Sequence, residues 1–316
     1  MKKLLVSFVL IIVILFITSI YLDFGKDVGK KVVLAPDTIV STSTSTPTLI
    51  VATSSEPIIS VMPKIIYQGD PVLITITSST TLKEMLFNNK ILPLFNYDGK
   101  ERAFLAIDFN ENKLEHDIKL KLSNGMVLNQ PLVVTIRKKE ERPLGIPDKL
   151  GGNTPEAAKT LVSNLSKENA TLNSVKTAAT IFWKDAFIFP LKTIFVTDEY
   201  GYNRKTVDYT IPHKGTDFRA PVGTEVMAMN KGVVRIAREY VIYGNTIVVD
   251  HGQGVNTLYM HLSELKVKEG DTVEIGQVIG LSGKTGYAEQ PHLHISIKIN
   301  GVSIDPMKFM GLFDVI

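Results

Sequence analysis

The chain of 316 residues contains no cysteine. This absence excludes disulfide bonds, a lipid-modified cysteine anchor and a metal site built from thiolates. A strong charge of either sign is also lacking, because 35 Lys and Arg oppose 32 Asp and Glu and leave a net charge of +3. This balance predicts no nucleic-acid partner, since nucleic-acid-binding proteins carry a basic surface. At 44% hydrophobic residues, the chain is long enough for two modest domains.

A long hydrophobic run lies near the start of the chain. Lys2 and Lys3 precede an uncharged stretch from Leu4 to Leu22, which as a helix would span about 30 Å, the thickness of the bilayer core. Residues 1–30 are therefore predicted to be a membrane anchor, with the lysines on the cytoplasmic side and the remainder exported. The alternative is a signal peptide that is removed, although Thr18 to Leu22 offers a poor cleavage site.

Two segments of different composition follow. Residues 31–63 are rich in Ser, Thr and Pro and include the hydroxyl run Ser41 to Thr46, so they are predicted to be a stalk without a core. In residues 64–137, short β-prone runs alternate with turns such as Asn124-Gly125, which predicts a small antiparallel β-sandwich. The expected strands are Val72 to Thr77, Ile91 to Phe95, Ala103 to Phe109, Asp117 to Leu122 and Met126 to Ile136.

Residues 138–190 are interpreted as a linker that holds one helix. Thr154 is a helix N-cap, and Pro155 follows it at the first helical position. Apolar residues then recur at helical spacing, at Ala158, Leu161, Val162 and Leu165. Such a stripe must be buried. It is expected to pack on one of the two β-domains; the alternative is that it holds them in a self-inhibiting arrangement.

The residues that carry chemistry lie in two short pieces of the segment 191–316. His292 and His294 stand two positions apart in an alternating apolar run, so a strand would aim both imidazoles into one cleft. His213 and Asp217 flank Gly215 and follow Pro212, which favours a loop running into a strand. Two histidines and one aspartate from this group would leave a fourth tetrahedral position open for water, which is the pattern of a catalytic rather than a structural zinc.

From about Phe195 to Pro306 the chain resembles the catalytic domain of the lysostaphin-type, or LytM-like, zinc metalloendopeptidases, which cut peptide cross-bridges in bacterial peptidoglycan. The resemblance implies a mainly β fold, with a barrel-sandwich-like antiparallel sheet in residues 191–316. The matching stretches occur in the family's order: His213-Lys-Gly-Thr-Asp217, Lys231-Gly-Val-Val, Tyr243-Gly-Asn-Thr, Asp250-His-Gly, Tyr259-Met-His261-Leu, Gly276-Gln-Val-Ile-Gly280 and Pro291-His-Leu-His294.

The resemblance also implies a role for each matching residue. The ligands of one Zn²⁺ would be His213, Asp217 and His294. His261 and His292 would be the catalytic histidines that bind or deprotonate the metal water and stabilise the tetrahedral intermediate. Arg204 falls where family members often carry an arginine and is expected to pair with a substrate carboxylate or the oxyanion. Two further histidines, His251 in a turn between strands and His116 in the other domain, are expected to be structural.

The sequence as a whole predicts a zinc endopeptidase that acts on peptidoglycan stem peptides or cross-bridges. Its predicted location is the bacterial cell envelope, tethered to the cytoplasmic membrane or, in the alternative, secreted. A rival from another class is a cell-wall binding or amidase-activating module that kept the fold and lost the zinc. Such modules usually lack one or more of the five site residues, all of which are present here. The bond that is cut and the oligomeric state stay open.

Overall fold

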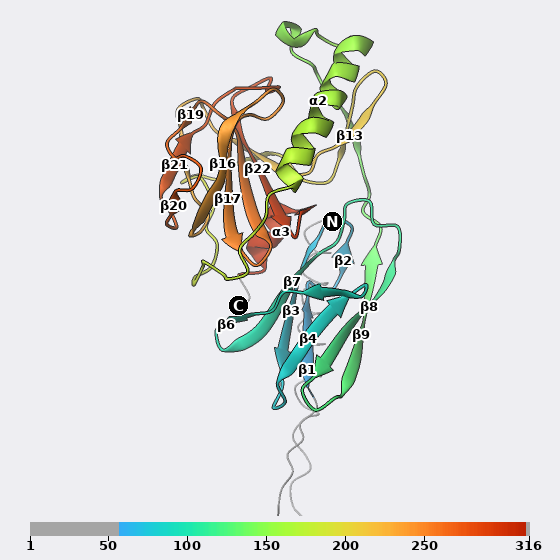
Figure 1. The fold of residues 1–316 in the computed structure, drawn as a ribbon. Helices are drawn as coiled ribbons and strands as arrows, with labels where there is room; N and C mark the ends of the chain where they lie inside the picture. Colours follow the sequence, from blue (N-terminus) through green and yellow to red (C-terminus); the bar gives the residue numbers. More distant parts are fainter. Residues whose placement is uncertain (1–56, 314–316) are drawn as a thin grey trace, which may run out of the picture. The chain divides into compact units, whose positions relative to one another are not determined.

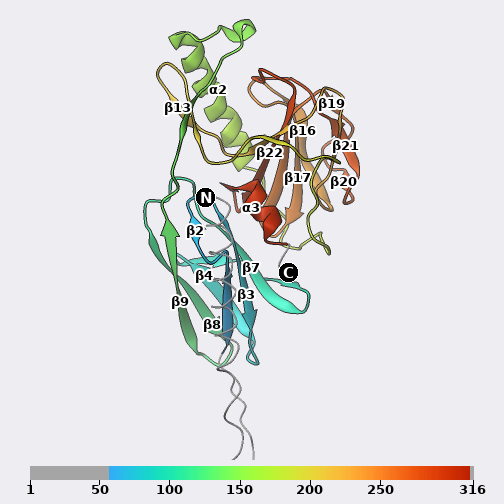
Figure 2. The same cartoon turned by 180° about the vertical axis from the view of Figure 1, so that it is seen from behind.

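The computed structural model describes residues 57–313, so the predicted anchor and most of the predicted stalk lie outside the described residues. The described part is mainly β with few helices, which confirms the predicted mainly β class (Figures 1 and 2). Within residues 57–313, no helix is both long enough and apolar enough to cross a membrane. These residues belong to one compact unit, and the predicted domain boundaries stay predictions.

The N-terminal part contains two sheets packed around one apolar core. One sheet has the strand order β1-β3-β7-β6 and the other β2-β9-β8-β4-β5. The side chains of Ile74, Met85, Ile118 and Leu120 are fully buried between them. The strands are β1 (Ile58–Met62), β2 (Ile66–Tyr67), β3 (Pro71–Thr77), β4 (Leu82–Phe87), β5 (Lys90–Leu92), β6 (Phe95–Tyr97), β7 (Lys100–Ala106), β8 (Glu115–Leu122) and β9 (Val127–Thr135).

The structure departs from the expected strands at four places. The run Ile91 to Phe95, expected as one strand, is divided between β5 and β6, which belong to different sheets. Ile58–Met62, assigned to the end of the stalk, forms β1 and pairs with β3. Leu82–Phe87 forms β4 although Leu-Lys-Glu-Met-Leu-Phe does not alternate strictly; pairing with β5 and β8 compensates for the weak pattern. The pairing of β2 with β9 is parallel, so the arrangement is not purely antiparallel.

The predicted helix is present as α2 (Pro155–Asn173). The Oγ of Thr154 accepts a hydrogen bond from the backbone N–H of Ala157, which is the expected N-cap. The segment before the helix holds β10 (Glu141–Pro143) and a 3₁₀ turn, η1 (Asp148–Leu150). β10 pairs in parallel with β12 and thereby joins a small sheet of order β10-β12-β13.

The C-terminal part is built on a large sheet of order β11-β14-β22-β18-β17-β16-β20, with β23 paired to β22. A second sheet has the order β15-β21-β19. The strands are β11 (Val196–Asp198), β12 (Asn203–Lys205), β13 (Thr210–Pro212), β14 (Thr216–Arg219), β15 (Glu225–Met227), β16 (Gly232–Tyr240), β17 (Gly244–Gly252), β18 (Val255–Leu262), β19 (Glu264–Leu265), β20 (Thr272–Val273), β21 (Val278–Leu281), β22 (His292–Ile299) and β23 (Val302–Ile304). Every residue of β18 is buried, because the sheet is covered on both faces.

The end of the segment interpreted as a linker belongs to the core instead. Trp183 and Phe187 are buried and pack against Phe309 of the short helix α3 (Pro306–Gly311) and against Phe104 of β7. Aromatic side chains are the main apolar signal in this stretch, and their burial explains why it has no regular periodicity.

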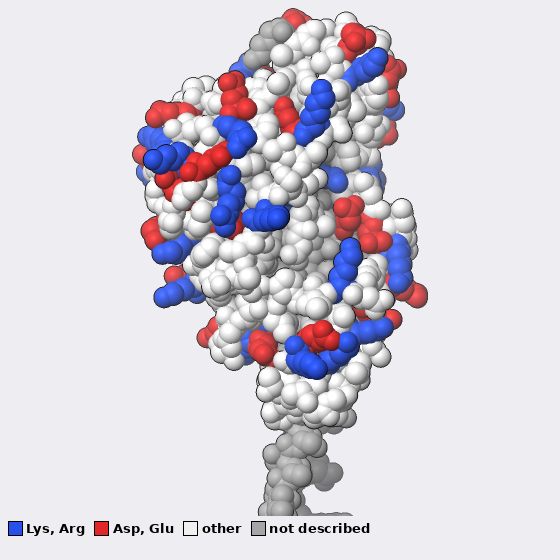
Figure 3. All heavy atoms as spheres, viewed as in Figure 1, with Lys and Arg blue, Asp and Glu red and all other residues white. Residues whose placement is uncertain are grey.

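Polar contacts join the N-terminal sheets to the same region. The buried Asp70 carboxylate accepts hydrogen bonds from Arg137 at 2.7 Å and from Lys308 of α3 at 2.8 Å. Elsewhere on the face seen in Figure 3, acidic and basic side chains are interspersed, as expected from the small net charge.

Candidate metal centre

Three neighbouring segments bring the site together. His294 lies on β22, and Asp217 lies opposite it on β14 as its register partner. His213 lies in the loop between β13 and β14, as the sequence predicts for a loop that runs into a strand. Gly215 is required in this loop, because a Cβ there would lie 2.3 Å from Nε2 of His294 and 2.6 Å from the carbonyl oxygen of Ile295.

The three side chains have the geometry of a metal site. One ligand atom from each of His213, Asp217 and His294 lies within 4.8 Å of the others. Nε2 of His213 is 3.3 Å from Asp217 Oδ1 and 3.3 Å from His294 Nδ1. A tetrahedral ion with bonds of about 2.1 Å places its ligand atoms about 3.4 Å apart, so these distances fit zinc. Nδ1 of His294 and Oδ1 of Asp217 are closer, at 2.6 Å.

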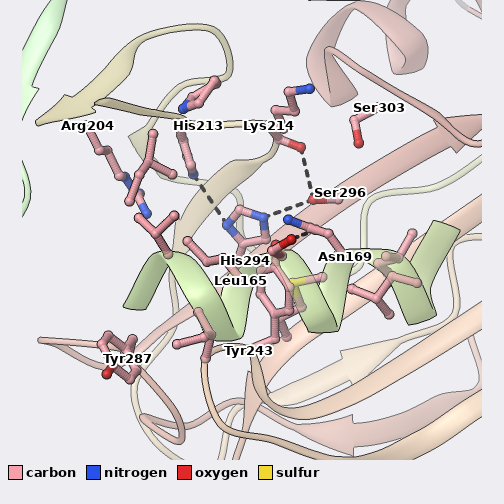
Figure 4. Close-up of a pocket in the computed structure, with 18 of the residues that line it drawn as sticks. Leu165, Asn169, Arg204, His213, Lys214, Tyr243, Tyr287, His294, Ser296 and Ser303 are labelled. Carbon is pink, nitrogen blue, oxygen red and sulfur yellow. Dashed lines mark hydrogen bonds between the residues drawn. The ribbon is translucent and has the colours of Figure 1, made fainter. Parts of the chain in front are cut away.

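The second polar atom of each of these side chains, the one turned away from the common centre, is hydrogen-bonded to another group, as Figure 4 shows for His294 and Ser296. Nδ1 of His213 donates to the carbonyl oxygen of Glu199 at 2.7 Å, which leaves Nε2 with a free lone pair. Nε2 of His294 lies 2.9 Å from Oγ of Ser296, and that hydroxyl donates to the carbonyl oxygen of Lys214 at 3.0 Å. His294 therefore donates through Nε2 and presents Nδ1. Such outer contacts fix the tautomer and orientation of metal-binding imidazoles.

The second carboxylate oxygen of Asp217 is held by Arg204 on β12. Nη2 of Arg204 donates to Asp217 Oδ2 at 2.6 Å, and Nε donates to the hydroxyl of Tyr202 at 3.0 Å. Burial would raise the pKa of Asp217, but His294 and His213 outweigh it and hold that pKa well below its usual range. Arg204 was expected to contact substrate; the described contacts place its guanidinium on Asp217, and the substrate role stays a prediction.

His261 and His292 lie beside the three-residue group. Their ring centroids are 4.8 Å apart, and Nε2 of His292 is 3.8 Å from Asp217 Oδ1. Nδ1 of His261 donates to the carbonyl oxygen of Thr285 at 2.9 Å, and Nδ1 of His292 donates to that of Gln290 at 2.8 Å. Both rings therefore keep a free Nε2 lone pair.

His261 has two unusual properties. Its backbone φ is +62°, a left-handed conformation that costs energy for a residue other than glycine and is found preferentially at functional sites. Burial, together with the neighbouring His292 and His294, lowers the pKa of His261 to about 3. The imidazole is thus neutral near pH 7 and presents an unprotonated Nε2.

The two histidines expected to be structural lie elsewhere. His116 is on β8 and hydrogen-bonds to Asn88 and to the carbonyl oxygen of Lys113. His251, expected in a turn between strands, lies within β17 instead, fully buried between the carbonyl oxygen of Lys231 and the hydroxyl of Thr257, each at 2.8 Å. Neither contacts the metal-binding group.

A cavity of about 580 Å³ adjoins the site and is covered by α2. Leu165 and Asn169 of the helix line it together with His213 and His294 (Figure 4). Leu161 and His261 also belong to its lining. Leu172, near the end of α2, packs against Leu258 and Met260 of β18. Met260 is the register partner of His294, so the helix covers the face of the sheet that carries the site.

Polar contacts hold α2 on this face. The carboxylate of Glu168 is buried and accepts hydrogen bonds from the backbone N–H groups of Val241, Ile242 and Tyr243, at 2.7, 3.0 and 3.2 Å. The hydroxyl of Tyr243 donates to Asn169 Oδ1 at 2.8 Å. The apolar stripe thus packs on the C-terminal β-domain, as expected, and it does so over the candidate site.

Sequence reasoning missed the roles of Glu168, Glu199 and Ser296. Glu199 contributes only its backbone carbonyl, which any residue has. Ser296 stands two positions after His294, and a strand places both side chains on one face. This spacing could have indicated that Ser296 lies beside His294. Glu168 stands three residues after Leu165 and seven after Leu161, so the helical spacing did place it on the buried face, but a charged side chain there gave no sign of its partners.

Comparison with known proteins agrees with this geometry. Residues 211–306 match Peptidase family M23. The chain contains an M23 peptidase domain. The domain is 45% identical over 97 residues to peptidoglycan DD-endopeptidase ShyA of Vibrio cholerae, a match that covers 31% of this chain and 23% of the relative. The DD-carboxypeptidase/endopeptidase Mpg of Neisseria meningitidis is 39% identical over 121 residues, which cover 38% of this chain and 28% of Mpg.

The likeness extends beyond the M23 domain at the level of fold. A putative M23 peptidase from Pseudomonas aeruginosa superimposes with a TM-score of 0.58 and 23% sequence identity, covering 78% of this chain and 96% of that one. By contrast, the sequence matches span about a quarter of the length of the curated relatives, 23% of ShyA and 28% of Mpg.

Proposed function

We propose that this protein is a zinc-dependent endopeptidase that hydrolyses stem peptides or cross-bridges of peptidoglycan. The observation that carries the proposal is the group formed by His213, Asp217 and His294, in which one atom of each side chain points to a common centre and the other is held by a neighbour. The names of ShyA and Mpg support peptidoglycan as the substrate class.

His213, Asp217 and His294 would hold the zinc ion through Nε2, Oδ1 and Nδ1. The chemistry that bound zinc supplies is Lewis acidity, which polarises a peptide carbonyl and lowers the pKa of water toward about 7. Arg204 supports this ligand set because its hydrogen bond to Oδ2 keeps Oδ1 of Asp217 turned toward the centre.

His261 and His292 would act as general bases and general acids. Each presents a free Nε2 to the cleft, since each Nδ1 is engaged with a backbone carbonyl. A neutral imidazole in this position can take the proton that water loses as it attacks the peptide carbonyl and can return it to the leaving amine. Once protonated, the same ring donates a hydrogen bond to the oxygen on which negative charge develops.

We also propose that the enzyme is exported and held at the cytoplasmic membrane by Leu4 to Leu22. The length of this uncharged run and the two preceding lysines support an anchor. The full-length protein should therefore stay with membranes after high-salt washing. A soluble product that begins near Ile20 to Phe24 would show cleavage instead.

The activity is tested by two measurements on the same preparations. Zinc content is measured on the full chain, and release of peptide fragments from defined muropeptides is followed by mass spectrometry. We expect one zinc per chain and cleavage for the wild type, and neither for His294→Ala, while His116→Ala retains both. A folded wild type that binds no zinc and releases no fragments would favour the rival, a cell-wall binding or amidase-activating module that lost the zinc.

A further inference from the structure

One face of β22 extends the candidate site along the cavity. His294, Ser296 and Lys298 alternate on this strand, so their side chains share a face, and all three line the cavity beside α2. At about 3.3 Å per residue, Lys298 lies roughly 13 Å along the strand from His294. Lys214 and Ser303 line the same cavity (Figure 4).

Lys298 is an unusual residue for this position. It is only 5% exposed, and its Nζ donates to the side-chain oxygen of Asn173, the last residue of α2. Within residues 57–313, no carboxylate forms an ion pair with it. An amide oxygen carries only part of the charge of a carboxylate, so the buried ammonium has a hydrogen-bond partner but no counter-ion.

The surroundings of Lys298 favour an anion. Burial, and secondly the positive charge of Lys214, lower the pKa of Lys298 to about 8. The side chain is still largely protonated at pH 7. The cavity lining therefore carries three positive side chains, Lys298, Lys214 and the Asp217-bound Arg204, against one carboxylate, that of Asp108. An anionic group entering there would gain charge-assisted hydrogen bonds and relieve the repulsion between the two lysines.

We propose that Lys298 and Lys214 form a subsite for a carboxylate group of the peptide substrate, further along β22 than the metal-binding residues. This inference rests on the proposed peptidase function and adds a specificity determinant to it. An extended peptide rises about 3.3 Å per residue, so the recognised carboxylate would lie about three to four residues from the bond that is cut, or fewer if a long side chain carries it.

The contact with Asn173 indicates how the subsite is used. The amide oxygen of Asn173 is bound where a carboxylate oxygen of the substrate would be bound. Substrate entry therefore exchanges a neutral acceptor on α2 for a charged one. If Lys298 served only to attach α2 to the sheet, replacing it would lower stability but would affect acidic and neutral substrates equally.

The test uses the zinc-loaded full chain and three versions of one peptidoglycan-derived peptide: one with all carboxylates free, one amidated at its C-terminus and one amidated on its side-chain carboxylate. We expect one amidation to raise KM by about 10- to 100-fold with little change in kcat, the effect of losing one charge-assisted contact. Lys298→Met should abolish this preference, and Lys298→Arg should retain most of it. Lys268→Met, which changes an exposed lysine of the same domain, should behave as wild type.

Several outcomes would overturn the subsite. One is a wild type that treats all three peptides alike, and another is a Lys298→Met variant that still discriminates. A loss of activity on all peptides in proportion to a lowered Tm would show a structural role. Calorimetric binding of the same three peptides provides a separate readout: if no peptide is cleaved, the proposed function fails, but a carboxylate preference in binding that Lys298→Met removes would still support the subsite.

Discussion

Replacing Glu168 should release α2 from the face that carries the candidate site. Its carboxylate accepts hydrogen bonds from the backbone N–H groups of Val241, Ile242 and Tyr243. Loss of the acceptor for a buried donor costs about 1–3 kcal/mol. Only the contact to Ile242 is fully buried, so we take the lower value for each of the three groups. Glu168→Ala then weakens docking of α2 by at most about 3 kcal/mol, which is roughly 100-fold in the ratio of docked to undocked helix.

Amide hydrogen exchange of the full chain measures this change directly. An undocked helix of 19 residues is marginal in water, so amides of α2 should exchange up to about 100-fold faster in Glu168→Ala, while those of β17 and β18 keep their protection. Glu156→Ala, at an exposed position on the same helix, is the matched control and should leave exchange nearly unchanged.

Turnover of muropeptides by the same variants shows whether α2 inhibits the enzyme or only packs against the sheet. If α2 blocks the cleft, kcat/KM should rise with the undocked fraction in Glu168→Ala. Unchanged exchange of α2 would refute the role given to Glu168. Faster exchange without faster turnover would show that the helix packs over the site without limiting entry.

Further predictions concern the histidines and Arg204. His294→Ala should abolish zinc binding, whereas His251→Ala should not, as measured by metal analysis of the folded variants. His261→Ala and His292→Ala should each keep zinc and lower kcat by about 100-fold or more, because they remove a proton acceptor or an oxyanion donor. Arg204→Met should weaken zinc affinity by about 10- to 100-fold, read by competition with a chelator, because Asp217 loses its outer support. Burial lowers the pKa of His251 from 6.5 to about 4, so between these values the unfolded chain binds the additional proton. The free energy of unfolding should therefore fall as the pH falls from 6.5 to 4, by about 3 kcal/mol from this residue, and denaturant titrations of His251→Gln should lack this part of the decrease.

Local patterns in the sequence were sufficient to predict the strand and the helix that line the candidate site. The alternation after His292 corresponds to β22, and the cap at Thr154 corresponds to the start of α2. Both features depend on near neighbours in the chain, through the two-residue period of a strand and the backbone N–H groups that a cap must satisfy. The proximity of His213 to His294 came from the family resemblance, since no local pattern joins residues so far apart.

The contacts that organise the cleft could not be predicted in this way. Glu168 binds backbone groups more than 70 residues away, and backbone N–H groups carry no sequence signature. Arg204 and Asp217 are joined by the folding of β12 toward β14, and Trp183 is buried in a stretch that has no periodic pattern. In each case the decisive partner is set by tertiary packing.

The way α2 is attached has a consequence for how the cleft can open. Glu168 and Lys298 are buried charges on opposite sides of the boundary between helix and sheet, and each is bonded to a neutral group across that boundary. Neither contact is an ion pair, so an anionic ligand that reaches Lys298 offers a stronger partner than Asn173 does. Undocking exposes the apolar stripe around Leu161 and Leu165, which opposes release. Whether substrate alone can displace α2 therefore depends on two free energies: the gain from the contact between Lys298 and an anionic ligand, and the cost of exposing the apolar stripe of the helix.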